Sequence, residues 1–387
     1  MNFDLIIVGG GLAGAALAVA LRRTALKIAV LEHAPPKRID GWDPRVYAYS
    51  PASARFLESL GVWAHLDESR LMPVREMLIS GDAGGSLRFS AHESGLSELA
   101  WIGESSHVHL ELWEGLKRQH NVSLFCPGVP AALECHDAGV SLRLQDGRSL
   151  SAKLVVGADG RESWVRGQAK IDASVTPYGE KGVVANLRCA RAHHGTAFQW
   201  FREDGVLAWL PLGGDAVSVV WSAPDEVADS LLALDDDAFC ERIAEAGGRC
   251  LGAFSLLSPR AAFPLRLMRV ARVVQPRLAL IGDAAHAIHP LSGHGINLGF
   301  QDAKALAEVL SAAASWEDPG ELSVLRRYAR QRAEEPFLLQ YATHGLNRLF
   351  GARNPVMAAL RNGGLNLTGQ LPVLKDILVR YAANGHF

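Results

Sequence analysis

The sequence predicts an α/β protein with two interleaved lobes and a helical C-terminal segment. Three apolar runs that each end in a glycine-containing turn predict the strands of a parallel sheet. These runs are LIIVGGGLAG near the N-terminus, VVGADGRES in the middle and LALIGDAAH in the last third of the chain. A β-rich stretch at residues 175–221 predicts a separate antiparallel sheet, and the chain after Ala303 has an almost wholly helical pattern.

The first elements form a βαβ unit. Residues 3–8 are a short apolar run that ends in glycines, which is typical of a buried parallel strand. Helical spacing at residues 12–23 and a second apolar run at residues 27–32 complete the unit. A loop containing Pro35 and Pro36 then leads to a helix expected to begin near Pro51.

The middle of the chain alternates between the two predicted lobes. Short strands are expected between residues 74 and 152, with one helix near residues 108–119, and residues 154–156 return to the buried-strand pattern. Long alternating stretches then predict antiparallel strands at Phe198–Arg202, Val206–Leu212 and Val217–Trp221. Two polar helical segments follow before the strand that begins at Leu278.

A chain of 387 residues is too long for one ordinary core, and no linker separates its parts. Each lobe is therefore expected to combine separated segments. The parallel-sheet lobe is predicted to comprise residues 1–73, 101–174 and 272–344, the antiparallel lobe residues 74–100 and 175–271, and the C-terminal helical segment residues 345–387.

Composition narrows the class of protein. The net charge of −2 gives no electrostatic reason to expect a nucleic-acid partner. The start MNFDLIIV has no basic region or cleavage site, and no apolar run approaches the roughly 20 residues that span a bilayer. A cytoplasmic protein is expected, with peripheral contact with the inner membrane left open. Scattered cysteines without CxxC spacing predict reduced thiols and no zinc site: Cys126, Cys135, Cys189, Cys240 and Cys250.

The first glycine turn predicts a dinucleotide site. Gly9, Gly11 and Gly14 form a GxGxxG motif between a strand and a helix. The glycines permit a tight turn, close approach of the backbone to a pyrophosphate, and close packing of helix on strand, while the helix N-terminus supplies partial positive charge. Glu32 closes the next strand, where its carboxylate is placed to accept hydrogen bonds from ribose hydroxyls. The lobe is therefore Rossmann-like.

The third turn distinguishes FAD from NAD. Gly282 and Asp283 follow a strand, and a carboxylate there is well placed to bind a ribityl chain, which a nicotinamide dinucleotide lacks. The alternative is that Asp283 only caps a turn. Downstream, Pro290, Gly293, Gly295 and Asn297 precede a helix expected at residues 298–310. N–H groups at its N-terminus are predicted to face the N1–C2=O edge of an isoalloxazine and to stabilise the reduced flavin anion.

The second turn contains Asp159 and Gly160, with Ser163 and Arg166 shortly after. An Asp-Gly pair after an apolar strand is usually only a turn. Its place between the other two motifs makes it a candidate part of the same site.

The order GxGxxG, DGxxSxVR and GDAAHxxxPxxGxGxN resembles the single-component FAD-dependent aromatic hydroxylases of the para-hydroxybenzoate hydroxylase-like superfamily. Within that superfamily, three longer stretches are similar to the ubiquinone-biosynthesis hydroxylases: Phe201–Ser222, Ile281–Ala303 and Gly345–Leu367. The resemblance covers nearly the whole chain. It implies a Rossmann-like FAD-binding lobe and an antiparallel substrate lobe.

The resemblance also implies an activity. Such enzymes use NADPH or NADH to reduce FAD, and the reduced flavin and O2 form a C4a-hydroperoxide that hydroxylates an electron-rich ring. No metal is required, because the cofactor supplies the reactive oxygen. The implied substrate is a polyprenylphenol precursor of ubiquinone. The resemblance also implies a ubiquinone-biosynthesis complex as a possible partner of the enzyme. Without a second GxGxxG motif, NAD(P)H is expected to dock transiently, helped by Arg161 or Arg166.

Roles for individual residues follow from the same resemblance. Asp159 and Gly160 are expected near the dinucleotide, and Asp283 at the ribityl hydroxyls. The wall of the catalytic pocket, which keeps water from the reacting oxygen, is expected at Pro290, Gly293, Gly295 and Asn297. The remaining expected cofactor contacts are Arg45, His109, Gly282 and Ile296. Arg45 has an equally weighted alternative as an exposed salt-bridging residue. His294 replaces the glutamine usual in the ubiquinone hydroxylases, and His286 and His289 are interpreted as packed or hydrogen-bonded residues.

Two further segments bear on the substrate. The strands at residues 206–212 and 217–221 contain no Lys or Arg, and the family uses this sheet as the ceiling of its pocket, which favours a polyprenylphenol over a benzoate. For Trp209 and Trp221 individually, a place in the core is the better interpretation. Residues 345–387 contain five cations and one acid among leucines, which predicts either a helical cover or a surface for membrane or partner.

Other functions remain open at this stage. The same chemistry on a small soluble aromatic is a close alternative, and a flavin-dependent prenyl reductase shares the scaffold. A non-enzymatic flavin-binding assembly subunit is a third alternative. A flavin halogenase is disfavoured because the chain lacks a WxWxIP run.

Overall fold

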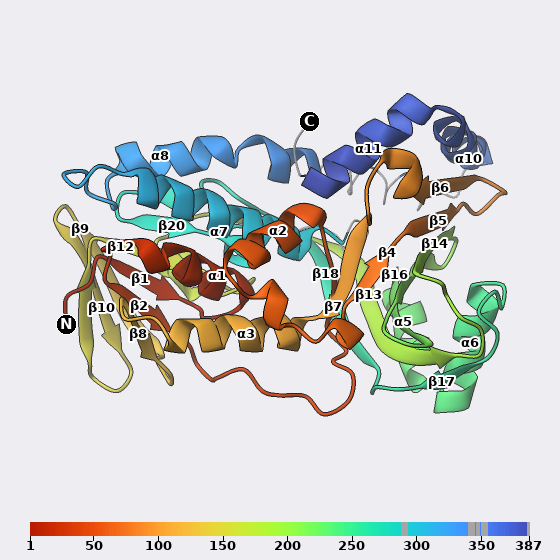
Figure 1. The fold of residues 1–387 in the computed structure, drawn as a ribbon, viewed down its shortest axis with the longest axis horizontal. Helices are drawn as coiled ribbons and strands as arrows, with labels where there is room; N and C mark the ends of the chain where they lie inside the picture. The colour runs from red at the N-terminus through yellow and green to blue at the C-terminus, as the bar shows by residue number, and fades with distance from the viewer. Residues whose placement is uncertain (288–292, 340–344, 346–348, 350–354, 385–387) are drawn as a thin grey trace.

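The computed structural model describes residues 1–287, 293–339, 345, 349 and 355–384. The chain forms a mixed α/β fold with two large sheets at opposite ends of an elongated molecule (Figure 1). A six-stranded sheet has the order β19-β20-β12-β1-β2-β8, and a nine-stranded sheet has the order β21-β18-β13-β16-β15-β14-β5-β6, with β17 paired to β13. The predicted fold class, an α/β lobe with an interleaved antiparallel sheet and a helical C-terminal segment, is confirmed.

The parallel part of the six-stranded sheet brings the three glycine turns to one edge. Strand β12 pairs in parallel with β1 on one side and with β20 on the other, and Gly157 lies opposite both Val8 and Leu280. The turns after these strands are therefore neighbours. The strands are β1 (Leu5–Val8), β2 (Ile28–Leu31), β8 (Val122–Phe125), β12 (Leu154–Gly157), β19 (Val274–Gln275) and β20 (Leu278–Leu280).

Helices cover one face of this sheet and a small β-sheet covers the other. The helical face packs against α1 (Leu12–Ala20), α3 (Ser105–Lys117), α7 (Gly295–Ala312) and α8 (Leu322–Gln331). The opposite face packs against α4 (Trp164–Gln168) and a sheet of β9 (Pro130–His136), β10 (Gly139–Leu144) and β11 (Ser149–Ala152). Since both faces are covered, the central strands β1, β2, β12 and β20 are wholly buried, as their continuous apolar sequences predict.

The nine-stranded sheet is antiparallel except for the pair β5–β14. Its strands are β5 (Glu76–Ser80), β6 (Ser86–Ser90), β13 (Ala173–Cys189), β14 (Thr196–Arg202), β15 (Gly205–Pro211), β16 (Ala216–Pro224), β17 (Phe254–Leu256), β18 (Ala261–Val270) and β21 (His286–Ala287). Trp209 and Trp221 are fully buried in a cluster with the helices α5 (Asp225–Ala233) and α6 (Asp236–Ala246). The interpretation of these two residues as core is confirmed.

One short segment joins the two large sheets. Strand β20 belongs to the six-stranded sheet, and β21, only six residues further on, pairs with β18 of the nine-stranded sheet. The turn between them is the predicted ribityl-binding turn. A smaller sheet of β3 (Val46–Tyr49), β4 (Met72–Val74) and β7 (Ala100–Glu104) lies between the two, next to α2 (Pro51–Ser59).

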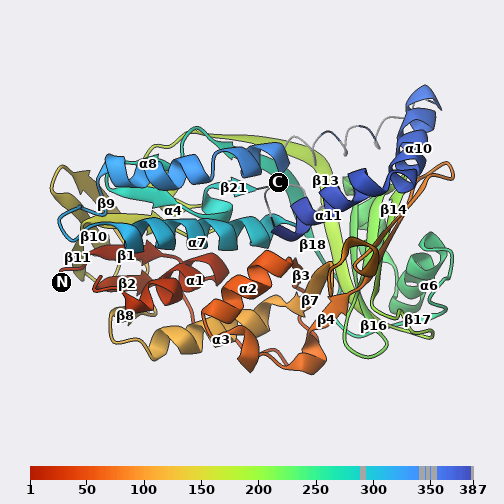
Figure 2. The ribbon, with the colours of Figure 1, turned by 45° about the horizontal axis from the view of Figure 1, so that its top comes forward.

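The C-terminal helices pack on the far end of the nine-stranded sheet (Figure 2). Helix α10 (Pro355–Gln370) lies against β6, and α11 (Pro372–Asn384) runs back toward α2. The Arg361 guanidinium pairs with Asp82, and the Asn362 side chain accepts hydrogen bonds from Ala83 and Gly85 in the β5–β6 turn. No helix in the described part of the chain is both long and apolar enough to cross a bilayer.

Three predicted helix boundaries differ from the structure. The helix expected at 12–23 ends at Ala20 and continues as a 3-10 turn, and the helix expected at 108–119 runs from Ser105 to Lys117. The helix expected at 298–310 begins three residues earlier, at Gly295. Gly295 and Asn297 have low helix propensity, so the sequence alone favoured a loop there.

We propose that the two lobes follow the two large sheets, with the segment boundaries predicted above.

Candidate functional site

The first glycine turn is shaped by two close backbone contacts and one open position. Gly9 has a φ of +102°, and a Cβ added there would lie 2.3 Å from the carbonyl oxygen of Ala158. A Cβ added at Gly14 would lie 2.0 Å from the carbonyl oxygen of Gly9. Gly11, by contrast, has no atom within 4 Å of such a Cβ, and no side chain caps the N-terminus of α1. A pyrophosphate fits this open, electropositive helix end.

Glu32 and His109 meet at this turn. The Glu32 Oε2 accepts a hydrogen bond from the Gly10 amide at 2.7 Å, and its Oε1 accepts one from the His33 amide at 2.8 Å. The Nε2 of His109 lies 2.8 Å from the Gly10 carbonyl oxygen. The structure therefore brings two predicted cofactor residues to opposite sides of Gly10. Sequence reasoning missed Trp113, which closes the site behind Gly10: a Cβ added at Gly10 would lie 3.0 Å from the Trp113 ring.

The second turn is held by its own acid. The Asp159 carboxylate accepts hydrogen bonds from the Ser163 hydroxyl at 2.6 Å and from the Val165 amide at 3.0 Å, so it caps α4. Burial raises the pKa of Asp159 above its ordinary value, against the opposing effect of these hydrogen bonds. Gly160 has a φ of +80° and open space around it. The Asp159 side chain thus fixes the shape of the turn, and Gly160 is the residue of the turn with open space beside it.

Arg166 braces the second turn against the third. Its Nη1 donates to the Ala284 carbonyl at 3.0 Å, and its Nη2 donates to the Arg161 carbonyl at 2.8 Å. Arg161 lies nearer the surface, with its Nη2 3.9 Å from the Asp283 carboxylate. Of the two arginines predicted to help dock NAD(P)H, Arg161 is therefore the better placed, and Arg166 is engaged within the fold.

In the third turn the Asp283 side chain points outward, and the residues on either side of it are buried. The Asp283 side chain is 47% exposed, whereas Gly282 and His286 on either side are buried. Gly282 has a φ of +59°, and its amide donates to Asp302 of α7. The pKa of the nearby Tyr47 hydroxyl is raised by burial and by the charge of Asp283, among others. Tyr47 and Asp302 are site residues that sequence reasoning missed.

The N-terminus of α7 forms the far wall of the site. Gly293, Gly295, Ile296 and Asn297 lie there, and Pro290 lies outside the described residues. Among the described residues no side chain caps this helix, and its first turn contains no acid, so its N-terminal end has partial positive charge that favours an anionic ligand. Such an end suits the N1–C2=O edge of a flavin.

Arg45 stands at the entrance to β3. It is exposed, and no salt bridge of Arg45 is found within the described part of the chain. The Arg45 amide is fixed in place, because it donates to the Asp43 carboxylate at 2.8 Å. The same carboxylate accepts from the Ser106 amide at 3.0 Å, and the Asp43 carbonyl accepts from Asn186 of β13 at 2.8 Å. Asp43 therefore links the arginine to both the α3 N-terminus and the nine-stranded sheet.

The face of the nine-stranded sheet that contacts Asp43 is uncharged at its centre. Val220 and Ala208 lie opposite one another, Ala208 lies opposite Gln199, and these residues share the face of Asn186 because side chains alternate along a strand. Val220 and Ala208 are half-buried, and Gln199 is buried. This face, and not the one bearing Trp209 and Trp221, is the candidate ceiling.

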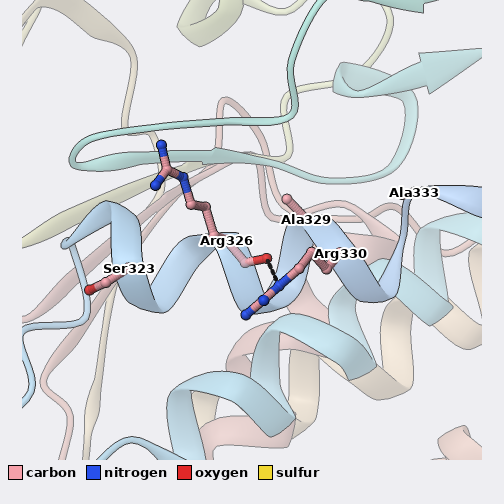
Figure 3. A pocket seen from close by; sticks show the side chains of 5 residues that line it. All are labelled: Ser323, Arg326, Ala329, Arg330 and Ala333. Carbon is pink, nitrogen blue, oxygen red and sulfur yellow. Dashed lines mark hydrogen bonds between the residues drawn. The ribbon is translucent and has the colours of Figure 1, made fainter.

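A separate hollow of about 320 Å³ lies on α8 (Figure 3). Its lining consists of Ser323, Arg326, Ala329, Arg330 and Ala333, and Arg330 donates to the Arg326 carbonyl. None of these residues belongs to the predicted site.

Comparisons with known proteins agree with this geometry. The FAD binding domain model matches residues 2–336. The chain is 34% identical to 3-demethoxyubiquinol 3-hydroxylase of Escherichia coli, covering 98% of each protein, and 33% identical to ubiquinone hydroxylase UbiL of Rhodospirillum rubrum, covering 98% of this chain and 89% of that protein. Among solved structures, p-nitrophenol 4-monooxygenase PnpA of Pseudomonas putida shares the fold, with a TM-score of 0.81 at 21% identity over 99% of this chain and 98% of that one.

The residues present fit FAD. Within the described residues, the helix N-termini at Gly11 and Gly295 have no side-chain cap and open onto the edge where the three glycine turns meet, and the Asp283 carboxylate of the third turn is half-exposed. The predicted resemblance is confirmed by the family model and by the relatives. This chain belongs to the FAD-dependent aromatic hydroxylases, a group of FAD-binding monooxygenases, and it uses FAD as cofactor and NAD(P)H as co-substrate.

Proposed function

We propose that this enzyme hydroxylates the aromatic ring of a polyprenylphenol precursor in ubiquinone biosynthesis, using NAD(P)H and O2. The observation that carries the proposal is full-length similarity to two ubiquinone hydroxylases, combined with the uncharged centre of the sheet face that contacts Asp43. A benzoate would need a cation to balance its carboxylate in a buried pocket. Val220, Ala208 and Gln199 offer none.

The residues of the three turns have separate roles in this proposal. The α1 N-terminus at Gly11 holds the pyrophosphate, Glu32 the ribose, Asp283 the ribityl chain, and the α7 N-terminus the flavin ring. When bound, FAD would take up reducing equivalents from NAD(P)H and activate O2 so that one oxygen atom is transferred to the ring. The chain's own contribution is to orient the flavin between the two helix ends and to exclude water.

We further propose peripheral contact with the membrane that contains such a substrate. Seven large apolar side chains on α10, on α11 and between them are exposed by 38–75%: Leu360, Leu367, Leu371, Val373, Leu374, Ile377 and Leu378. Two cations of these helices turn toward the protein, since Arg361 pairs with Asp82 and Lys375 pairs with Glu93 at 3.0 Å. A third, Arg380, is exposed and pairs with Asp376 of its own helix. Exposed apolar side chains gathered in this way mark interaction sites.

Vesicle flotation tests the membrane contact. The parent protein is expected to float with phosphatidylethanolamine–phosphatidylglycerol vesicles, and the double variant Leu367→Glu/Ile377→Glu is expected to stay at the bottom. Trp316→Glu, which changes a side chain 83% exposed outside these helices, serves as the control and is expected to float. Equal flotation of parent and double variant would refute the contact. Absence of flotation in the parent would instead assign the face to a protein partner in a biosynthetic complex.

Mass spectrometry of quinone lipids tests the reaction. A strain that lacks this gene and grows in air is expected to accumulate a prenylated precursor one hydroxyl short, and the structure of that precursor identifies the ring carbon. An unchanged quinone profile would contradict the proposal and favour a small soluble aromatic. A precursor that differs only in its prenyl double bonds would favour the reductase alternative.

A further inference from the structure

We infer that Asp302 is the positioning residue of the flavin site: it fixes the turn from Gly282 to His286 through a buried ionic network with His286 and Arg332. The inference rests on FAD binding and is independent of which aromatic ring is hydroxylated. Two of its residues, Asp302 and Arg332, lie outside the three turn motifs.

A single oxygen of Asp302 holds both ends of the turn. Its Oδ2 accepts a hydrogen bond from the Gly282 amide at 2.9 Å and lies 2.7 Å from the Nε2 of His286. Gly282 and His286 flank Asp283, the only outward-facing acid of the turn. The direction in which Asp283 projects is therefore set by a side chain on α7, two helical turns beyond the end that faces the flavin.

The other oxygen of Asp302 connects the turn to α8. Its Oδ1 accepts from the Arg332 Nε at 2.8 Å, and the Arg332 Nη1 donates to Glu335 at 2.5 Å. The Asp302, His286 and Arg332 side chains are exposed by 1%, 7% and 8%. Charges this deeply buried are tolerated only when they are paired and hydrogen-bonded, so the members of the network depend on one another.

The protonation states match this arrangement. Burial opposes the charged form of His286, but the charge and hydrogen bond of Asp302 outweigh it and raise the pKa of His286 above its ordinary value. Burial likewise opposes the charge of Asp302, and His286 and Arg332 together lower the pKa of Asp302. The charged groups that face His286 are Asp302 on α7, Arg332 after α8, and Asp283 on its own turn.

The network acts where the two large sheets join. His286 belongs to β21 and pairs with Arg269 of β18, while Gly282 follows β20. Helix α8 makes a second contact where the two sheets join, since the Tyr328 hydroxyl donates to the Leu280 carbonyl at 2.9 Å. Gly299 of α7 lies against Gly282, so no side chain separates the helix from the turn. Asp302 is thus the side chain through which α7 and α8 hold the turn.

The Asp302→Asn variant tests the inference by FAD affinity. The amide keeps the size of the carboxylate but removes its charge and places an NH2 group against a donor of His286 or Arg332. We expect the dissociation constant of FAD, measured by fluorescence quenching on apoprotein, to rise about tenfold or more. The visible circular dichroism of the remaining bound flavin is expected to change as well. Glu308→Gln, an exposed acid of the same helix, is the control and should leave both readouts unchanged.

A second variant keeps the test decisive. His286→Gln retains one donor toward Asp302 and is expected to weaken FAD binding by less than Asp302→Asn does. An FAD dissociation constant and flavin spectrum equal to the parent's in Asp302→Asn would overturn the inference, even if the apoprotein unfolds at lower urea. Should Asp302→Asn fail to fold, His286→Gln decides, and parent-like affinity and spectrum in that variant would overturn the inference equally.

Discussion

The side chain of Asn297 is hydrogen-bonded to the backbone of Ser50, 247 residues earlier in the chain. Its Oδ1 accepts from the Ser50 amide at 2.9 Å, and its Nδ2 donates to the carbonyls of Ala48 at 2.8 Å and Gly293 at 3.1 Å. Asn297 is 3% exposed. A residue predicted as part of the catalytic wall therefore uses its whole amide to fix the α7 N-terminus against β3 and α2.

Asn297→Ala is expected to lower the free energy of unfolding by about 2–4 kcal/mol, because it leaves the buried Ser50 amide and Ala48 carbonyl without their partner. Urea unfolding of the apoprotein measures the change. Asn366→Ala is the matched control, since Asn366 is exposed and accepts one hydrogen bond from the Ser86 amide. A loss at Asn297 no greater than at Asn366 would refute the anchoring role.

Gly11→Ala and Gly14→Ala are expected to separate cofactor binding from folding. An added methyl at Gly11 meets no atom of the chain but enters the space proposed for the pyrophosphate. The apoprotein should keep its unfolding midpoint while FAD binding falls by about tenfold or more. At Gly14 the methyl would overlap the Gly9 carbonyl, so stability and FAD binding should fall together. Parent-like FAD affinity in Gly11→Ala would contradict the assignment of the pyrophosphate site.

The two arginines of the second turn are expected to differ. Arg166→Met removes the donors to Ala284 and Arg161, so it should lower the unfolding free energy by about 1–3 kcal/mol and weaken FAD binding. Arg161→Met alters a more exposed side chain and should mainly raise the KM for NAD(P)H. Steady-state kinetics with each nicotinamide, together with urea unfolding, distinguishes the two. An unchanged KM in Arg161→Met would exclude this arginine from docking of the co-substrate.

The His286–Asp302 pair predicts a pH dependence of stability. The folded pKa of His286 is raised, so its contribution is fully present below the unfolded value near 6.5 and is lost as the pH rises through the folded pKa. The folded pKa of Asp302 is lowered, so its contribution is present above the unfolded value near 3.8 and is lost as the pH falls through the folded pKa. Because of His286, the unfolding free energy of the parent should decline as the pH rises above 6.5, and this decline should be smaller in His286→Gln. The difference amounts to about 1.4 kcal/mol for each pH unit by which folding raises the pKa of His286. An unaltered slope would show that His286 is neutral in the folded protein.

Local sequence patterns predicted the parts of the site that depend on backbone shape. Gly9, Gly14 and Gly282 are recognisable because their turns need positive φ angles or tolerate no Cβ, and such needs restrict a position to glycine. The three strands before the turns were predictable because buried parallel strands are continuous apolar runs. These signals were enough for the fold and for FAD.

The contacts that hold the turns were not predictable from local pattern. Asp302 and Arg332 are partners across 30 residues, and each alone reads as an ordinary polar residue of a helix. The same is true of Asp43 and Asn186, which meet across 143 residues. Trp209 and Trp221 occupy one face of the sheet because of the register between β15 and β16, and the packing of α5 and α6 makes that face part of the core.

Transfer of isotopically labelled O2 tests the central claim most directly. Purified holoenzyme, a prenylated phenol and NAD(P)H would be incubated under labelled O2, and the lipid product analysed by mass spectrometry. The account predicts one labelled oxygen on the aromatic ring and NAD(P)H oxidation that depends on the phenol. A product without label, or label found only in hydrogen peroxide with every phenol tried, would contradict it.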